Sequence, residues 1–528
     1  MREKSLEPID VETKGGKDME TPVPSAYSST ADLFETGTVD PVYQAKARIL
    51  NATMQEMGMG KYQWWLFAIA GFGWFADSVW PLLSGLILSP VLSEFQFSSP
   101  FLSLAQNVGL LVGAIFWGLG CDIWGRRWSF NITLFLAGVF GLAAGGAPNF
   151  IALASLLAVV GLGVGGNLPV DSAVFLDFVP GSHQYLLTIL SIWWSVGQLV
   201  VDLIAWPLIA NFSCDPSAPA GTCTRAGNMG WRYLLFTLGG MTLLLWAIRF
   251  FVFPLEESPR FLIGRGRDAE AVAVVQRVAK FNGVECSLTV EQLERAGDAA
   301  LDAAGQDQDK KATRVLSESS VFTGEHVKAL FATPKLAWST SLLIAIWCII
   351  GLASTLYNSF LPFLLASRGA EFGDSSYNIT YRNQVILAVI GVPGAFFAGW
   401  LVEQRFVGRK GALAISAGLT GVFLFASTTA RSSNALLGWN CGYSFFSNIM
   451  YGVLYAISPE LFPAKDRGTG NGLTATATRI FGIIAPVIAL YANLETAVPV
   501  YVSGGLIIGS GALALLLPYE PAARPPFK

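Results

Sequence analysis

Twelve apolar runs, each about as long as one membrane crossing, constrain this chain more than any other feature. A bilayer core about 30 Å thick needs roughly 20 apolar residues in a helix that crosses it. Only 13% of the residues are charged and the mean hydropathy is +0.50, so most of the surface must face lipid. The runs cover about 63–87, 101–121, 128–147, 149–171, 186–210, 231–253, 337–361, 383–403, 411–429, 434–457, 470–492 and 498–517. The sequence therefore predicts an all-α polytopic membrane protein with twelve transmembrane helices.

The runs form two groups of six, separated by one long polar segment. We expect a disordered N-terminal tail, two bundles, a linker with short helices between them and a short C-terminal tail. The N-terminal tail is predicted at 1–60, and the two bundles at 61–253 and 337–517. The linker is predicted at 254–336 and the C-terminal tail at 518–528. Within the tail only 41–57 has helical spacing. The linker has few apolar clusters and is too short to bury an enzymatic core.

Basic residues gather on alternate loops, which sets the orientation of the helices. By the positive-inside rule these loops and both termini are cytoplasmic. The residues are Arg126, Arg127, Arg260, Arg265, Arg267, Arg405, Arg409, Lys410, Lys465 and Arg467, on the same side as Lys46, Arg48 and Lys61. The first 60 residues hold no apolar run of signal-peptide length, so the first helix is expected to direct insertion. We expect the plasma membrane, with the vacuole or another endomembrane as the alternative.

Two outside loops carry features of an oxidising compartment. Asn211 and Asn378 begin glycosylation sequons, although such triplets also arise by chance. Cys214 and Cys223 bracket one of these loops and could form a disulfide. The six cysteines form no CxxC pair and the chain has only two histidines, so we expect neither a metal site nor a cofactor.

A charged loop recurs in the two halves of the chain. The first copy reads Gly118-Leu-Gly-Cys-Asp122-Ile-Trp-Gly125-Arg126-Arg127, and the second reads Gly399-Trp-Leu-Val-Glu403-Gln-Arg-Phe-Val-Gly408-Arg409-Lys410. Asp177-Phe-Val-Pro180 follows Asp122 by 55 residues, and Glu460-Leu-Phe-Pro463 follows Glu403 by 57. Asp77 precedes Asp122 by 45 residues, as Asn358 precedes Glu403. These spacings indicate a duplicated six-helix unit, whose substrate site would lie between the halves near the middle of the membrane.

Three motifs together resemble the major facilitator superfamily. The loop Gly118–Arg127 looks like its signature between helices 2 and 3. Glu256-Glu-Ser-Pro-Arg260 resembles the segment that ends helix 6 in sugar-porter-like members, and Pro459-Glu460-Leu-Phe-Pro463 with Arg467 resembles their loop between helices 10 and 11. The resemblance covers about 60–517. It implies a major facilitator fold of two pseudo-symmetric six-helix bundles.

The resemblance also implies a cytoplasmic gate made of charged loop residues that lock one conformation during alternating access. The gate residues are Asp122, Gly125, Arg126, Arg127, Asp177, Glu403, Arg409, Glu460 and Arg467. Within this set, we expect Asp122 to lie with the arginines at 126, 127 and 467, and Glu403 with Arg409. The alternative is that the cations only anchor the loops at the membrane surface.

The chain is similar to one branch of this superfamily in particular. Gly71-Phe-Gly-Trp-Phe-Ala-Asp77 and Gly166-Asn-Leu-Pro169 look like the synaptic-vesicle-glycoprotein-like branch, which includes metabolite:proton symporters and organic-ion carriers. The chain lacks the Pro-Glu-Thr-Lys-Gly ending and the Gln-Leu-Ser of sugar porters. Its fifth helix, which includes Ser191–Gln198, lacks the Gly-Pro-rich signature of drug exchangers. These departures weaken hexose transport and drug efflux as specific functions.

Four ionisable side chains fall inside predicted membrane helices, where each is a functional candidate. Arg479 needs a carboxylate partner or an anionic ligand, because a guanidinium keeps its charge. Asp77 or Asp202 could be that partner, or could carry the coupling proton, although a static pair that only joins helices is the alternative. Asp202 lies toward the outer third of its helix, where solvent could reach it, and Asp171 is expected at the cytoplasmic interface.

Uncharged polar residues on the same helices could line a substrate cavity. They are Asn107, Asn167, Gln198, Tyr357, Asn358, Gln384, Asn440 and Asn448. Hydrogen bonds between membrane helices would also account for each of them. Trp193 and Trp194 are expected to pack rather than to bind substrate.

The sequence favours a secondary active transporter that imports a small polar metabolite, an organic acid in particular, with protons. A sugar or polyol:proton symporter and a non-transporting nutrient receptor are the alternatives. No nucleophile–base set, metal cluster or nucleotide loop supports an enzyme. We expect a monomer that binds a small-molecule substrate, protons and lipid. The net charge of −3 gives no reason to expect nucleic acid.

Overall fold

The computed structural model describes residues 41–183, 186–215, 223–304, 327–328, 330–361, 364–365, 376–402, 404, 407–462, 467–491 and 497–518. Its regular elements are all helical in this part of the chain. The long helices are α3 (Lys61–Phe95), α4 (Pro100–Trp124), α5 (Arg126–Ala144), α6 (Phe150–Val164) with α7 (Asn167–Phe178), α9 (Ser191–Phe212), α10 (Gly230–Ala247), α16 (Pro334–Asn358), α18 (Tyr377–Val402), α19 (Gly408–Ser427), α20 (Ser433–Leu461), α21 (Arg467–Tyr491) and α22 (Val498–Leu515). Each predicted apolar run corresponds to one of these helices, or to α6 with α7, so the predicted twelve-helix, all-α fold is confirmed.

Eleven helical spans among the described residues are long and apolar enough to cross a membrane. The remaining predicted crossing is α20. Its sequence carries several polar side chains, Asn440 and Asn448 among them, which lower its mean hydropathy.

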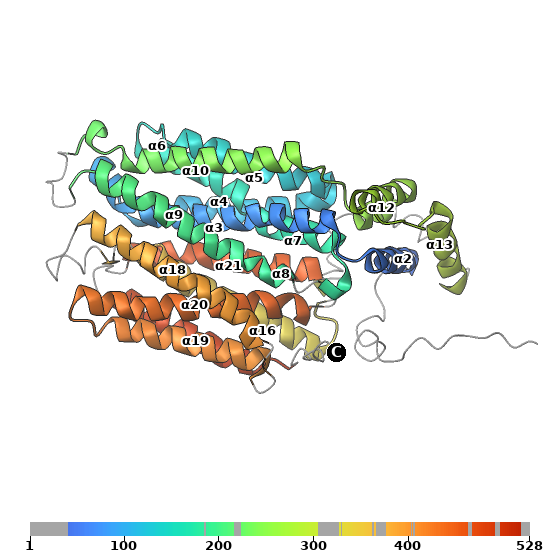
Figure 1. Ribbon diagram of the computed structural model, residues 1–528. Coiled ribbons are helices and arrows are strands. Elements are labelled where there is room, and N and C mark those ends of the chain that lie inside the picture. Colours follow the sequence, from blue (N-terminus) through green and yellow to red (C-terminus); the bar gives the residue numbers. More distant parts are fainter. Residues whose placement is uncertain are drawn as a thin grey trace, which may run out of the picture. The chain divides into compact units, whose positions relative to one another are not determined.

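Short helices gather at one end of the bundle, beyond the long helices (Figure 1). They are α2 (Pro41–Met57), α11 (Pro259–Gly264), α12 (Asp268–Asn282) and α13 (Val290–Ala304). We call this end the linker-helix end, and the opposite end, which carries Cys214 and Cys223, the disulfide end. The helix α2 lies within the predicted tail, where 41–57 has helical spacing, and an ion pair between Lys46 and Asp268 holds it to α12. The remaining short elements are η2 (Gly181–His183), α8 (Leu186–Ile189), η3 (Arg225–Gly227) and η4 (Ile248–Val252).

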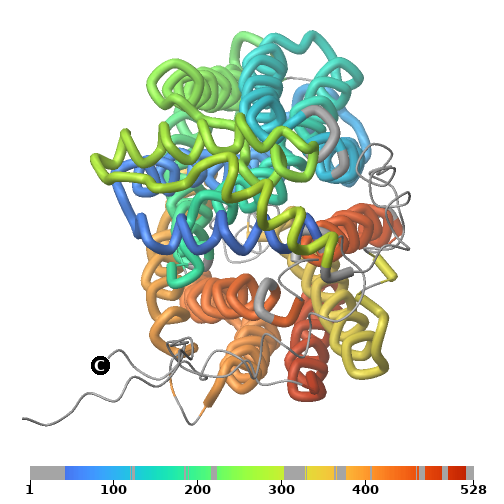
Figure 2. The backbone as a smooth tube through the Cα atoms, turned by 90° about the vertical axis from the view of Figure 1, so that its right-hand side faces the viewer, coloured from blue at the N-terminus to red at the C-terminus, as the bar shows by residue number. Residues whose placement is uncertain are grey.

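The helices α3 to α10 form one half of the bundle and α16 to α22 form the other. Figure 2 shows the two groups one above the other, seen from the linker-helix end. Across the boundary, α9 packs against α18 and α4 packs against α21. Segments far apart in sequence therefore share one interface, as the internal repeat predicts.

Glycines allow α4 and α6 to pack closely within the first half. Gly109 and Gly113 are spaced as GxxxG on α4, and a Cβ at either would lie 1.9 or 2.2 Å from a carbonyl oxygen of α6. Gly161 and Gly165 repeat this spacing on α6, where a Cβ would lie 2.5 or 2.2 Å from a carbonyl oxygen of α4. Two interlocked small-residue faces of this kind bring membrane helices into backbone contact.

Candidate functional site

An ion pair joins the two halves near the middle of their helices. Arg479 of α21 lies with Nη2 2.6 Å from Oδ1 of Asp77 on α3. The Asp77 side chain is 5% exposed and that of Arg479 is 18% exposed. Either Asp77 or Asp202 could have been the partner on sequence grounds, and the structure pairs Arg479 with Asp77. Breaking such a pair by removing one partner leaves an uncompensated charge, at a cost of about 3–5 kcal/mol.

A second buried ion pair corrects the sequence prediction for Asp171. This residue was expected at the interface, but its side chain is fully buried and its Oδ2 lies 2.7 Å from Nη2 of Arg249. Arg249 lies in the π-helical turn η4 and also donates to the carbonyl oxygens of Ile69 and Phe130, at 3.0 and 2.6 Å. Arg249 was not predicted from the sequence, although it is an ionisable residue within the sixth apolar run and therefore a candidate by the same rule as Asp171.

The glycine at position 73 leaves the space that this second pair needs. A Cβ at Gly73 would lie 1.6 Å from Oδ2 of Asp171 and 3.2 Å from Nη2 of Arg249. Asp77 follows Gly73 by one helical turn on α3. The pair in the first half therefore lies one turn away from the pair that joins the halves.

We expect Asp171→Leu to destabilise the protein by about 3–5 kcal/mol, because it leaves the Arg249 guanidinium buried without its carboxylate. The double variant Asp171→Leu/Arg249→Met should recover most of this loss, since neither charge then remains. Thermal unfolding of the three proteins in the same detergent measures the effect. A single variant as stable as the wild type would show that Arg249 does not depend on Asp171.

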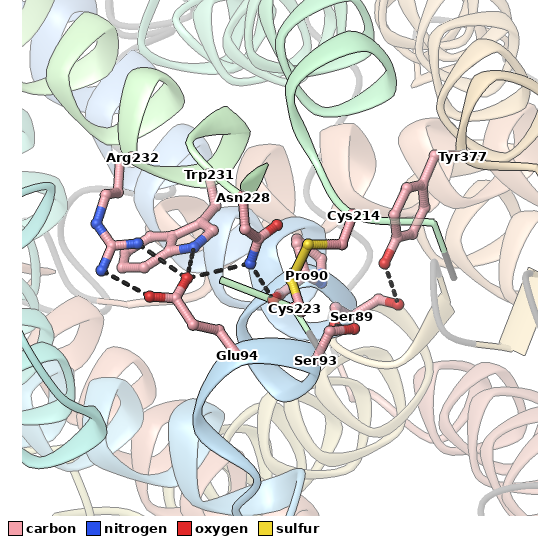
Figure 3. Close-up of a disulfide and its surroundings, with 10 residues drawn as sticks. All are labelled: Ser89, Pro90, Ser93, Glu94, Cys214, Cys223, Asn228, Trp231, Arg232 and Tyr377. Carbon is pink, nitrogen blue, oxygen red and sulfur yellow. Dashed lines mark hydrogen bonds and ion pairs between the residues drawn. A yellow bond between two sulfur atoms is a disulfide. The ribbon is translucent and has the colours of Figure 1, made fainter. Parts of the chain in front are cut away.

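A third ion pair lies at the disulfide end. Glu94 of α3 accepts two hydrogen bonds from Arg232, at 2.9 and 3.0 Å, and one each from Trp231 and Asn228, at 3.1 Å (Figure 3). The disulfide between Cys214 and Cys223 lies beside this cluster (Figure 3). The start of α10, with Asn228 just before it, is thereby fixed to the end of α3.

Two tyrosines of α18 hold the halves together near the disulfide end. Pro90 has no N–H, so the carbonyl of Leu86, four residues earlier on α3, lacks its helical donor. The hydroxyl of Tyr381 donates to this carbonyl oxygen, and the hydroxyl of Tyr377 lies 3.1 Å from Oγ of Ser89. An unpaired backbone acceptor on one half is thus satisfied by a side chain of the other.

We expect Tyr381→Phe to open the disulfide end more often, because the buried Leu86 carbonyl then loses its donor at a cost of about 1–3 kcal/mol. The measurement is the rate at which an impermeant maleimide labels a Ser84→Cys reporter on α3. The rate should rise several-fold over the same reporter with intact Tyr381. Tyr501→Phe, at an exposed position of α22, is the control. Equal labelling rates in all three proteins would contradict a holding role for Tyr381.

The sequons also lie near the disulfide end, on exposed side chains. Asn211 donates to the Pro207 carbonyl oxygen at 2.8 Å, and the Asn378 side chain accepts from Trp206 at 2.6 Å. Glycosylation of either residue stays a prediction.

Most of the predicted cavity-lining residues already have partners within the protein. Asn107 donates to Ser103, Tyr357 donates to Asn440, Tyr443 donates to Asn358, and Asn448 bonds both Ser195 and Ser444. These contacts include one between the halves, from Ser195 of α9 to Asn448 of α20. The hydrogen-bonding capacity of these groups is therefore largely used in holding helices.

Three other predicted residues are buried with at least one polar atom lacking a partner in the described part of the chain. They are Asn167, for both side-chain atoms, Gln384, for Nε2, and Asp202, for Oδ1. Asp202 is 3% exposed, so the alternative that solvent reaches it does not hold in this conformation. Gln198, one turn before Asp202 on α9, is half-buried.

A group of aromatic side chains from both halves includes Trp74, one turn from Asp77 on α3. The ring centroid of Tyr455 on α20 lies 5.1 Å from that of Trp74 on α3 and 5.0 Å from that of Trp347 on α16. The ring centroid of Tyr451, one turn earlier on α20, lies 5.4 Å from that of Trp194 on α9. Trp74 precedes Asp77 by three residues and shares its helix face. Trp194 was expected to pack rather than to bind substrate, and Tyr451 and Tyr455 were not predicted as site residues.

The charges at the linker-helix end form a cluster built from two of the sequence motifs. Asp177 forms an ion pair with Arg126, and its Oδ1 lies 3.8 Å from Nη1 of Arg260. Glu257 accepts from the backbone N–H of Arg126 at 2.9 Å, which satisfies a free donor at the start of α5. Gly125 has φ +101°, and a Cβ there would lie 2.6 Å from Oε2 of Glu257. Both the backbone conformation and the space require glycine.

Only some of the remaining residues predicted for the gate lie in the part of the chain that the structure describes. Arg409 is half-buried at the start of α19, and Arg127 directs its backbone N–H toward Glu257 at 3.4 Å. The side chains of Asp122, Glu460 and Arg467, and the whole of Glu403, lie outside the described residues. Glu257, which joins this charged cluster, was not predicted from the sequence, although it belongs to the Glu-Glu-Ser-Pro-Arg motif.

Two six-helix halves joined through buried charges define a multi-pass secondary transporter of the membrane. The chain belongs to the family described as sugar (and other) transporter, whose sequence model matches residues 26–513. This family and the relatives below are transporters rather than enzymes, as the sequence predicts.

Three comparisons describe its relatives. The chain is 78% identical to the MFS siderochrome iron transporter 1 of Ceriporiopsis subvermispora (strain B), over 93% of this chain and 94% of that one. It is 26% identical to the niacin transporter NiaP of Acinetobacter baylyi (strain ATCC 33305 / BD413 / ADP1), over 84% and 90%. The structure of the proton:xylose symporter XylE bound to 6-bromo-6-deoxy-D-glucose superposes with a TM-score of 0.62 at 16% identity, over 87% and 96%. The superposition shows a common fold.

Proposed function

We propose that the protein is a proton-coupled symporter that imports a small organic anion. Arg479 binds the anionic group of the substrate and Asp77 takes up the proton. The observation that carries this proposal is the ion pair between these residues, because it is buried and it links the two halves that must move relative to each other.

The two residues couple proton and anion through their charges. Protonation of Asp77 removes the negative charge that Arg479 faces, and the guanidinium then needs another anion. A substrate carboxylate supplies it, with two oxygens that match the guanidinium fork. The centre carries no net charge with the pair intact, and none when a proton and a monovalent anion are both bound. Either form can therefore change conformation, whereas a centre with the proton alone would leave the guanidinium unpaired.

The name of one relative supports a carboxylate as the substrate. The relative from Acinetobacter baylyi is named as a niacin transporter, and niacin is a carboxylic acid. A neutral sugar would need many hydrogen-bond partners, and most polar residues on these helices are already bonded within the protein. The sugar or polyol alternative is therefore less well supported.

A siderochrome is the second candidate substrate. The relative that is 78% identical carries this name, and its similarity extends over nearly the whole chain. The same guanidinium could bind an acidic group of an iron chelate, which would be cargo rather than a resident metal.

We place the disulfide end outside the cell and the linker-helix end in the cytoplasm of a plasma-membrane protein. The disulfide suits an oxidising space. The basic residues Arg126, Arg260 and Arg277 lie at the opposite end, as the positive-inside rule requires of a cytoplasmic surface. The charges joined there by Asp177 would form the cytoplasmic gate.

Uptake into proteoliposomes tests the function. The purified protein is offered labelled nicotinate, a ferric hydroxamate complex or xylose, each with and without an inward proton gradient. We expect gradient-driven accumulation of nicotinate. Accumulation of the iron complex alone would favour the siderochrome, and accumulation of xylose alone would overturn the anion proposal. Binding without uptake of any compound would indicate a receptor.

A further inference from the structure

We propose that the site selects anions carried on a flat aromatic ring, and that Trp74, Trp194, Tyr451 and Tyr455 form its ring-binding subsite. This inference rests on the proposed role of Arg479 as the anion-binding residue. It adds the shape and surface chemistry of the rest of the substrate.

The four side chains come from both halves of the protein. Trp74 belongs to α3 and Trp194 to α9, while Tyr451 and Tyr455 belong to α20. Ring centroids lie 5.1 Å apart for Trp74 and Tyr455, and 5.4 Å apart for Trp194 and Tyr451. The two tyrosine rings lie 6.4 Å apart at an angle of 29°. A ring bound among them would contact both halves at once.

The aromatic group adjoins the charged pair. Trp74 lies three residues before Asp77 on α3, and the Tyr455 ring packs against Trp74 with centroids 5.1 Å apart. Tyr451 lies one helical turn before Tyr455 on α20. A carboxylate on Arg479 would therefore place the attached group near these rings. Tyr451 and Tyr455 keep partial exposure although they lie on a helix within the bundle, so the subsite is not filled by packing alone.

Two indole N–H groups of this subsite have no acceptor among the residues that the structure describes. Nε1 of Trp74 and Nε1 of Trp194 are buried, and neither has a hydrogen-bond partner within the described ranges. The Trp74 side chain is only 2% exposed. Buried tryptophan N–H groups normally find a partner. Trp347, which also packs against Tyr455, illustrates this, since its Nε1 donates to Oγ of Ser458 at 2.8 Å. A ligand with an acceptor atom in or on its ring would satisfy the two free donors.

Aromatic faces and free N–H donors together favour one class of substrate. An aromatic ring gains edge-to-face and offset-stacked contacts that a saturated ring of the same size lacks. A heteroatom in the ring plane can accept a hydrogen bond without disturbing those contacts. The site therefore fits a heteroaromatic monocarboxylate.

A matched pair of acids tests the proposal. Benzoate and cyclohexanecarboxylate have the same charged group and similar size, but only benzoate is aromatic. Equilibrium binding of each acid is measured by calorimetry on the purified full-length protein. We expect benzoate to bind about tenfold more tightly. Pyridine-3-carboxylate should bind more tightly again, because its ring nitrogen accepts a hydrogen bond.

Substitutions at Tyr455 assign the preference to the subsite. In Tyr455→Leu the ratio of the two affinities should fall close to one, while cyclohexanecarboxylate keeps its affinity. Tyr455→Phe keeps a ring and should keep the ratio, which excludes a merely structural effect of the substitution. Tyr501→Leu, at an exposed position of α22, is the matched control and should behave as the wild type. If Tyr455→Leu does not fold, the wild-type ratio and Tyr455→Phe still decide.

The outcomes separate this inference from the proposed function. Equal affinity of the wild type for both acids, or a benzoate preference that survives in folded Tyr455→Leu, would overturn the aromatic subsite and leave the anion proposal standing. Failure of all three acids to bind would remove both. Loss of binding in Arg479→Gln with the ring preference intact in the wild type would support both.

Discussion

Replacing Arg479 with glutamine is expected to lower carboxylate uptake at least about a hundredfold. The substitution removes the positive charge with which the substrate anion pairs in place of Asp77. Hydrogen bonds to a charged group contribute about 1.5–3 kcal/mol each. It also leaves the Asp77 carboxylate, 5% exposed, without its cation. Initial uptake into proteoliposomes under a fixed proton gradient measures the effect, after equal protein incorporation has been verified.

Two further variants make the Arg479 result specific. Arg431→Gln changes an exposed arginine of the C-terminal half and should leave uptake unchanged. Arg479→Lys keeps the charge but loses the planar fork, so it should retain a small part of the activity. Full uptake by Arg479→Gln would show that the pair only joins the helices, which is the static alternative.

Replacing Asp77 with asparagine is expected to abolish accumulation of substrate against its gradient while exchange of internal for external substrate continues. Asparagine resembles the protonated carboxyl group in shape but cannot release a proton. Arg479 would then remain available to the anion at any pH, and uptake would stop responding to the proton gradient. Both modes are measured with the same labelled nicotinate, as net uptake and as counterflow.

The control for Asp77 is an aspartate far from the bundle core. Asp302→Asn, on an exposed face of α13, should behave as the wild type in both assays. Proton-driven accumulation by Asp77→Asn would refute the assignment of the coupling proton to this residue. Asp202, buried with an unsatisfied Oδ1, would then be the carboxylate to test next.

The helix pattern could be predicted from the sequence because each crossing is a local property. Twenty or so apolar residues between charged loops predict a crossing whatever surrounds them. The duplicated loop predicted two halves, and the cost of a charge in lipid singled out Asp77 and Arg479. Their pairing could not be chosen over a pair with Asp202, because helix order in the sequence does not give helix neighbours in space.

The parts that sequence reasoning missed depend on contacts between distant segments. Asp171 was placed at the interface from its position along one helix, yet Arg249 of another helix buries it completely. Glu257 caps α5 from beyond the sixth helix. The aromatic group near the pair combines five residues from four helices, α3, α9, α16 and α20, and these residues form no sequence motif. Residues that come together from several helices have no fixed spacing in the sequence, so the sequence alone does not predict such a group.

Because Pro90 interrupts the helical hydrogen bonds of α3, the hydrogen bond from Tyr381 to this helix tolerates side-chain substitution on α3. The acceptor that Tyr381 uses is a main-chain atom of Leu86, so no substitution of the Leu86 side chain removes it. The contact depends on the identity of the residue at two positions only, the proline that frees the carbonyl and the tyrosine that reaches it. A substitution at another side chain of this stretch of α3 would therefore leave the Tyr381 hydrogen bond between the halves in place.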